Sequence, residues 1–151
     1  YGVGQYVERA IRYLSEAGIR RRKIVVYTLY NYVDNPDDFF QRVRDILSWG
    51  AVSYPMRFEP LNSLKKNTYI SSKWSRDLLE MVADAQRVLG THGAFPPYEA
   101  LRRKLEEATD FQGGFALRPP KKRLRRHPAL LSDRMEQDLQ DPIIATTCRM
   151  Q

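Results

Sequence analysis

Polar and charged side chains follow each of the two apolar segments that the sequence predicts as strands. The first segment is followed by Asn31, and the second runs into Arg57, Glu59 and Asn62. Ligands of α/β sheets and barrels bind at the carboxyl ends of the strands and in the loops that follow. Arg57 and Glu59 are two residues apart, so on a strand they point the same way, with Phe58 on the other face. Side by side they are able to bind a carboxylate, a ribose or a ribose-like diol.

A purely structural interpretation of these residues stays open. Arg57 and Glu59 would then form an ion pair at the rim of the sheet, while Asn31 and Asp34 would only cap the turn. The tyrosines in and beside the strands are typical of packing between layers rather than of cofactor platforms, and they are Tyr27, Tyr30, Tyr32 and Tyr54.

Other chemistry has little local support. The two histidines, His92 and His127, have no partner at a metal-ligand spacing, so no metal site is predicted. Phosphate-loop and hydrolase motifs such as GxGxxG, GxxxxGK[ST] and GxSxG are absent from the sequence. Cys148 is the only cysteine, which excludes an intrachain disulfide or a thiolate cluster and favours a cytoplasmic origin. We predict no catalytic residue in this chain.

Two strands, each preceded by a helix, must position the residues at the strand ends. Apolar residues recur at helical spacing from 7 to 17, and Gly18 follows as a stop signal. Residues 24–30 are continuously apolar, β-branched and aromatic, which predicts a central strand of a parallel sheet, covered on both faces. Residues 34–38 combine a side-chain cap, a proline and two carboxylates, so a helix begins there and ends before Gly50. A second strand is expected over 51–58.

Beyond the second strand, residues 59–73 are irregular. Ser75 is predicted to cap a third helix, with Trp74 packing onto Leu79, and a fourth helix is predicted to begin at Pro97 and to bury Tyr98, Leu101 and Leu105. The apolar pattern breaks at Phe111, so we expect residues 1–110 to form the folded domain. We expect 111–151 to be a basic, weakly ordered extension, with a short helix at 130–139.

Two strands cannot form a stable parallel sheet that is buried on both faces. The order helix, strand, helix, strand, helix is typical of repeated βα units, so the fold class is α/β with mainly parallel strands. The sequence begins at Tyr1 without an initiator Met, and we expect a piece of a longer protein. The missing strands are therefore expected from upstream sequence or from a second copy of the chain.

Two segments resemble the late strands of radical S-adenosylmethionine (radical SAM) proteins. The first is residues 27–40, Tyr-Thr-Leu-Tyr-Asn-Tyr-Val-Asp-Asn-Pro-Asp-Asp-Phe-Phe, an apolar strand that leads through an acidic, proline-bearing turn into a helix. The second is residues 52–61, Val-Ser-Tyr-Pro-Met-Arg-Phe-Glu-Pro-Leu. The resemblance covers about residues 5–108 and implies the C-terminal part of a partial (β/α) barrel.

The resemblance also implies cofactors for the parent protein. In the family, a CxxxCxxC motif holds a [4Fe-4S] cluster that binds and reductively cleaves S-adenosylmethionine. That motif is absent here, so we expect this chain to be inactive alone and to contribute a wall facing the cofactor or the substrate. By position in the pattern, Asn31, Arg57, Glu59 and Asn62 are the predicted cofactor-binding residues. The small-molecule or macromolecular substrate is not identified.

Two further functions stay open. The net charge is +7, and five positive charges lie within Lys121–Arg126, which makes a nucleic-acid-binding module an alternative. The other alternative is a small homo-oligomeric α/β protein, in which a second copy of the chain completes the sheet. No apolar run approaches the length of a membrane span, so no membrane partner is expected.

Overall fold

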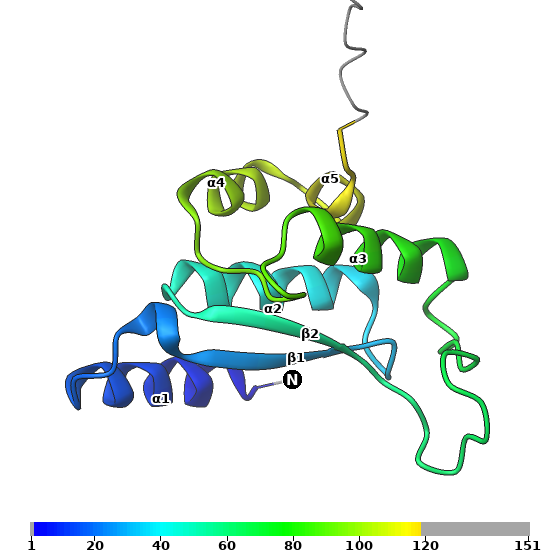
Figure 1. Ribbon diagram of the computed structural model, residues 1–151, viewed down its shortest axis with the longest axis horizontal. Helices are drawn as coiled ribbons and strands as arrows, with labels where there is room; N and C mark the ends of the chain where they lie inside the picture. Colours follow the sequence, from blue (N-terminus) through cyan, green and yellow to red (C-terminus); the bar gives the residue numbers. More distant parts are fainter. Residues whose placement is uncertain (1, 119–151) are drawn as a thin grey trace, which may run out of the picture. The chain divides into compact units, whose positions relative to one another are not determined.

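The computed structural model describes residues 2–118, and they form a mixed α/β unit (Figure 1). Helix α1 (Gly4–Glu16) and a short 3₁₀ turn, η1 (Arg21–Lys23), lead into strand β1 (Val25–Tyr30). Helix α2 (Pro36–Ser48) connects β1 to strand β2 (Val52–Arg57). Three helices follow, namely α3 (Arg76–Val88), α4 (Glu99–Glu107) and α5 (Phe111–Phe115). The α/β class predicted from the sequence is confirmed.

The two strands are parallel and are joined by α2. Their register runs from Val25 opposite Val52 to Tyr30 opposite Arg57. Because partners in register point to the same side of a sheet, Tyr27 and Tyr54 share one face. Their rings make an edge-to-face contact with centroids 5.5 Å apart.

Local signals set the ends of α2. The side chain of Asn35 accepts a hydrogen bond from the backbone N–H of Asp38 (2.8 Å), and the Asp38 carboxylate accepts one from the N–H of Asn35 (3.1 Å). Pro36 opens the helix, where a missing N–H costs nothing. Gly50 follows it at φ 81°, a left-handed conformation that glycine adopts without strain. The cap and stop predicted for this helix are confirmed.

The main core lies on one side of the sheet. Strand β1 contributes Tyr30 to it, and the segments that flank α3 contribute Trp74 and Phe95. The helices contribute the rest, with Phe39, Val43, Leu47 and Val82 among the most deeply buried. A second, smaller cluster joins α1 to α2 and to the start of the sheet, and it consists of Ile11, Ile24, Ile46 and Ala51 with Val7, Val26 and Trp49 packed against it. Both clusters lie on the side of the sheet that α2 covers.

The other side of the sheet is open, which corrects the prediction that residues 24–30 are covered on both faces. Val25, Tyr27 and Leu29 are 47%, 69% and 42% exposed, whereas Thr28 and Tyr30 are buried. The run supplies side chains to two faces of the sheet, but the helices within residues 2–118 cover only one of them. Within residues 2–118, β1 also pairs with β2 alone and is not a central strand.

The predicted extension begins too early. Phe111 and Phe115 lie on α5 and are 2% exposed, so the folded unit continues beyond residue 110. Gly114 allows this packing, because a Cβ there would lie 2.4 Å from the ring of Phe40. The glycine pair that indicated a break in the pattern is thus part of a close helix contact.

A few further predictions can be placed. Ser75 caps α3 by accepting a hydrogen bond from Leu78 N–H (3.3 Å), as expected. Helix α4 begins at Glu99 rather than at Pro97, and Tyr98 is 55% exposed, not buried. The predicted helix at 130–139, the basic cluster Lys121–Arg126 and Cys148 lie outside the described residues.

Candidate functional site

Asn31 lies at the carboxyl end of β1 and is fully buried. Its side-chain N–H₂ donates to the carbonyls of Phe58 (3.3 Å) and Tyr69 (3.0 Å), and its oxygen accepts from the N–H of Ser71 (2.9 Å). Its φ of 65° is a left-handed conformation that asparagine tolerates better than most residues. Asn31 therefore holds the 59–73 loop against the end of the strand.

Arg57 holds the same loop from β2. Its guanidinium donates to the carbonyls of Tyr69 (2.8 Å) and Asn67 (3.2 Å), so Asn31 and Arg57 share the Tyr69 carbonyl. The Nε atom of Arg57 lies 3.6 Å from a carboxylate oxygen of Glu59, a loose ion pair between partly buried side chains. The structure therefore brings Asn31, Arg57 and Glu59 together around the base of the loop.

The Glu59 carboxylate is incompletely used. Within residues 2–118, neither of its buried oxygens forms a hydrogen bond, and the same holds for Arg57 Nε. Asn62 is not part of this group, since it lies on the exposed stretch of the loop. Arg57 also acts on Tyr30, whose pKa is raised by burial and lowered to a smaller extent by the nearby guanidinium.

Asp34 has a role that the sequence only hinted at. Its buried carboxylate accepts hydrogen bonds from Arg42 and from the backbone N–H of Tyr32 (3.1 Å), and its carbonyl accepts from the indole N–H of Trp74 (2.9 Å). Arg42 also donates to the carbonyl of Leu29 (2.8 Å). The spacing of eight residues between Asp34 and Arg42, across a helix start, gave no signal for this pair.

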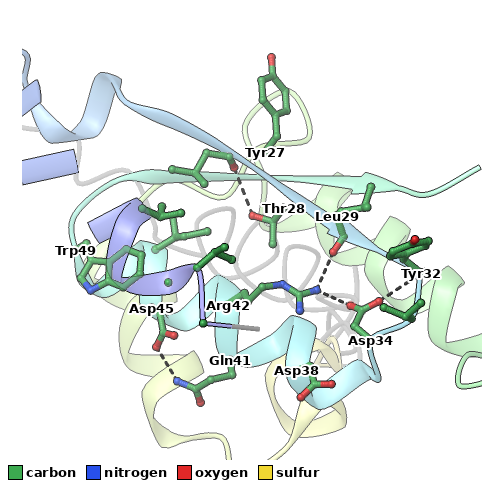
Figure 2. Close-up of a pocket in the computed structure, with 17 residues that line it drawn as sticks. Tyr27, Thr28, Leu29, Tyr32, Asp34, Asp38, Gln41, Arg42, Asp45 and Trp49 are labelled. Carbon is green, nitrogen blue, oxygen red and sulfur yellow. Dashed lines mark hydrogen bonds and ion pairs between the residues drawn. The ribbon is translucent and has the colours of Figure 1, made fainter. Parts of the chain in front are cut away.

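A groove of about 610 Å³ runs beside β1, between the start of α1 and the face of α2 (Figure 2). Its apolar lining comes from both helices and the strand and includes Val3, Val7, Val26, Leu29, Ile46 and Trp49. Arg42 lies between Asp45 and Asp34 in this view and is hydrogen-bonded to Leu29 and Asp34, and Tyr27 points away from the groove (Figure 2). Sequence reasoning missed this groove because it depends on where α1 packs.

The open sheet face is the second feature that the sequence did not reveal. Besides Val25, Tyr27 and Leu29 it carries Met56, which is 44% exposed, and the partly exposed Tyr54. None of these side chains is charged. A surface of this kind is able to bind an apolar ligand or another part of a protein, and contiguous apolar patches usually mark such contacts.

The described residues contain no cluster of metal-ligating side chains. Residues 2–118 contain no group of three or more His, Cys, Asp or Glu side chains able to hold a metal ion. The hydroxyls of Thr28 and Ser53 share a buried 2.8 Å hydrogen bond, which links β1 to β2.

In this part of the chain, no helix has both the length and the apolar character needed to cross a bilayer.

Comparisons with known proteins gave no match to a family, to a curated protein or to a solved structure.

Proposed function

We propose that this chain is the C-terminal part of a radical SAM barrel and supplies a wall that faces the cofactor or the substrate. The observation that carries the proposal is the one-sided arrangement of helices on a parallel sheet. The resemblance of residues 27–40 and 52–61 to late strands of that family supports it from the sequence.

The placement of the helices supports a barrel rather than a doubly wound sheet. In a doubly wound sheet helices cover both faces, whereas in a (β/α) barrel they lie outside and the other face of the strands points inward. Here α1 and α2 pack together through Val7, Ile11 and Ile46, and α3 joins the same side through Leu79 and Val82. The open face with Tyr27 and Tyr54 is then the inner face of the barrel.

The edges of the sheet favour a partial barrel that ends in this chain. The outer edge of β2 is closed, because Ser53 exchanges two backbone hydrogen bonds with Phe95 (3.0 and 2.7 Å). Further along, Gln86 donates to the carbonyl of Pro55 (3.1 Å), and Pro55 has no N–H to pair. The sheet therefore has room to continue from β1 but not from β2.

The cofactors of the family fit this chain unequally. A [4Fe-4S] cluster does not fit, because Cys148 is the only thiol and the described residues offer no alternative ligand set. Contact with S-adenosylmethionine remains a proposal for Asn31, Arg57, Glu59 and Asn62. The Glu59 carboxylate supports it best, because its oxygens form no hydrogen bond within residues 2–118 and a carboxylate is a suitable acceptor for ribose hydroxyls.

In this arrangement the residues of the chain bind and orient but do not react. Asn31 and Arg57 fix the loop that borders the strand ends, and the open face excludes water from the interior that it lines. These are the positioning roles by which a protein supports chemistry that belongs to its cofactor. The chain alone is then inactive.

The test is to express the full reading frame anaerobically with iron and sulfide, and this chain beside it as the control. The expected result is iron–sulfur absorbance, and reductive cleavage of S-adenosylmethionine to 5′-deoxyadenosine, in the longer protein only. A reading frame without an upstream CxxxCxxC, and a protein without a cluster, would show that the radical SAM proposal is wrong.

A further inference from the structure

The free edge of β1 can be assigned from its pairing with β2. The N–H of Val52 donates to the carbonyl of Ile24 (2.9 Å), and the N–H of Phe58 donates to that of Tyr30 (2.8 Å). Backbone groups of successive residues in a strand point to opposite edges. Val25, Tyr27 and Leu29 therefore direct their N–H and C=O groups away from β2, along the groove.

The groove has the form of an empty strand position. It lies directly beside this edge, between the start of α1 and the face of α2, and it is lined on the helix side by the apolar residues Val7, Ile46 and Trp49. A strand placed there would pair with Val25 and Tyr27 and turn every second side chain into the apolar lining. Unpaired strand edges are templates for this kind of addition.

The start of α1 indicates the direction of the missing strand. Helix α1 runs antiparallel to β1 and leads through η1 into its start, so the first residues of α1 lie toward the carboxyl end of β1 (Figure 1). Gly2 and Val3 accordingly line the same groove as Tyr32 and Val33, which follow that end. Chain that leads into α1 therefore enters at the carboxyl end of the sheet. A strand parallel to β1 delivers it there, and a helix that then returns along the sheet to feed β1 is the usual crossover between parallel strands.

Arg42 sets the limit of the pairing. Its guanidinium, held by the Asp34 carboxylate, already donates to the carbonyl of Leu29 at the free edge. An incoming strand can thus use the backbone groups of Val25 and Tyr27 and the N–H of Leu29, but not the Leu29 carbonyl.

We propose that the groove beside β1 binds one β-strand parallel to β1, supplied by the polypeptide that leads into α1, and that Arg42 ends its pairing at Leu29. This strand should be apolar at the alternate positions that face α1 and α2. The inference rests on the proposed function for the source of the strand, but it involves neither the cluster nor S-adenosylmethionine.

Amide hydrogen exchange tests the pairing without any cofactor. The amide of Tyr27 is compared in the 151-residue chain and in the longer protein of the same reading frame, both free of iron. We expect exchange at least about 100-fold slower in the longer protein, since a paired amide exchanges only on opening. Equal rates in the two proteins would overturn the proposal, as would a reading frame with no strand-forming segment before α1.

Substitutions at Tyr27 separate the backbone from the side chain. Tyr27→Pro removes the N–H that the incoming strand needs, while an unpaired strand edge tolerates proline. In the longer protein, Tyr27→Pro is expected to speed exchange in the upstream strand at least tenfold, and Tyr27→Ala, which keeps the N–H, is expected to leave it within about twofold. Equal effects of the two variants would contradict strand pairing.

A second copy of the chain is the competing occupant of the groove, and measurements on the 151-residue chain detect it. If the 151-residue chain sediments as a dimer, and its Tyr27 amide becomes protected as the concentration rises, then a second copy fills the groove and the proposal is wrong. A monomer with a rapidly exchanging Tyr27 amide supports the proposal.

The limit set by Arg42 has its own readout. Arg42→Ala combined with Asp34→Asn frees the Leu29 carbonyl without leaving a buried carboxylate unpaired. In the longer protein we expect one additional protected amide in the upstream strand, opposite Leu29. An unchanged protection pattern would remove Arg42 from the proposal.

Discussion

The two faces of the sheet are built from alternate residues of the same short strands, yet they differ in what covers them. On one face Thr28, Tyr30 and Ser53 are buried under helices of this chain. On the other, Tyr27 and Met56 are exposed, although they are apolar or aromatic side chains that a fold usually buries. The apolar character of a strand face thus predicts that the face will be covered. Which helix, strand or partner covers it depends on the elements that pack around the sheet.

The largest expected difference between the faces is in stability. Phe39 is fully buried and contacts the rings of Tyr30, Trp74 and Phe115. Phe39→Ala should lower the free energy of unfolding by about 3–5 kcal/mol, the usual cost of a cavity of this size. Urea unfolding followed by circular dichroism measures it.

The matched control is Tyr27→Ala on the open face. It removes a ring that is 69% exposed, so the expected change in unfolding free energy is within about 0.5 kcal/mol. Similar losses for Phe39→Ala and Tyr27→Ala would break the comparison, because they would show that this chain already covers both faces.

A smaller effect is expected at Asn31, where the covered face meets the loop. Asn31→Ala leaves the N–H of Ser71 and the carbonyl of Tyr69 without this partner, and the lost hydrogen bonds should cost about 1–3 kcal/mol. Alanine also strains the left-handed backbone by roughly 1 kcal/mol, which glycine does not. Asn31→Gly should therefore be the milder variant by urea unfolding, and a harsher Asn31→Gly would contradict this assignment.

A smaller change in stability is expected for substitutions in α5, and it tests whether this helix belongs to the core. A Cβ at Gly114 would lie 2.4 Å from the Phe40 ring, so Gly114→Ala should cost about 1–3 kcal/mol through overpacking. At Gly113 the nearest heavy atom would be 3.2 Å away, on the side chain of Asp110. Gly113→Ala is thus the control. If thermal unfolding gave Gly113→Ala a lower midpoint than Gly114→Ala, α5 would be excluded from the core.

The smallest effect concerns pH. Burial raises the pKa of Tyr30, so the folded state keeps its phenol proton to higher pH than the unfolded state does. The contribution of Tyr30 to stability is therefore complete below about pH 10 and falls as the pH rises further. Tyr30→Phe should reduce this alkaline loss in unfolding curves recorded at a series of pH values, and an identical slope in both proteins would show that Tyr30 is not buried.

Much of the fold could be predicted because its signals are local. The cap of α2 lies within four residues, from Asn35 to Asp38, and the stop at Gly50 needs only a left-handed backbone. The continuous apolar run at β1 predicted a strand of a parallel sheet. These features depend on neighbouring backbone groups, so the sequence by itself determined them.

The sequence predicted the location of the candidate site but not the contacts within it. The sequence put Asn31, Arg57 and Glu59 at the strand ends, and there they do lie together, but they meet around the Tyr69 carbonyl, a partner 38 residues from Asn31. Whether they also contact a cofactor stays a prediction.

Tertiary structure alone decided the features that distinguish this chain. Phe111 joins the core because its N–H donates to Asp37, 74 residues away, and because Gly114 lets Phe40 approach. The groove and the open face exist because every helix within residues 2–118 packs on one side of the sheet. Hydrophobic attraction is not directional. An apolar residue in the sequence therefore predicts burial, but it does not identify the residues that it will pack against.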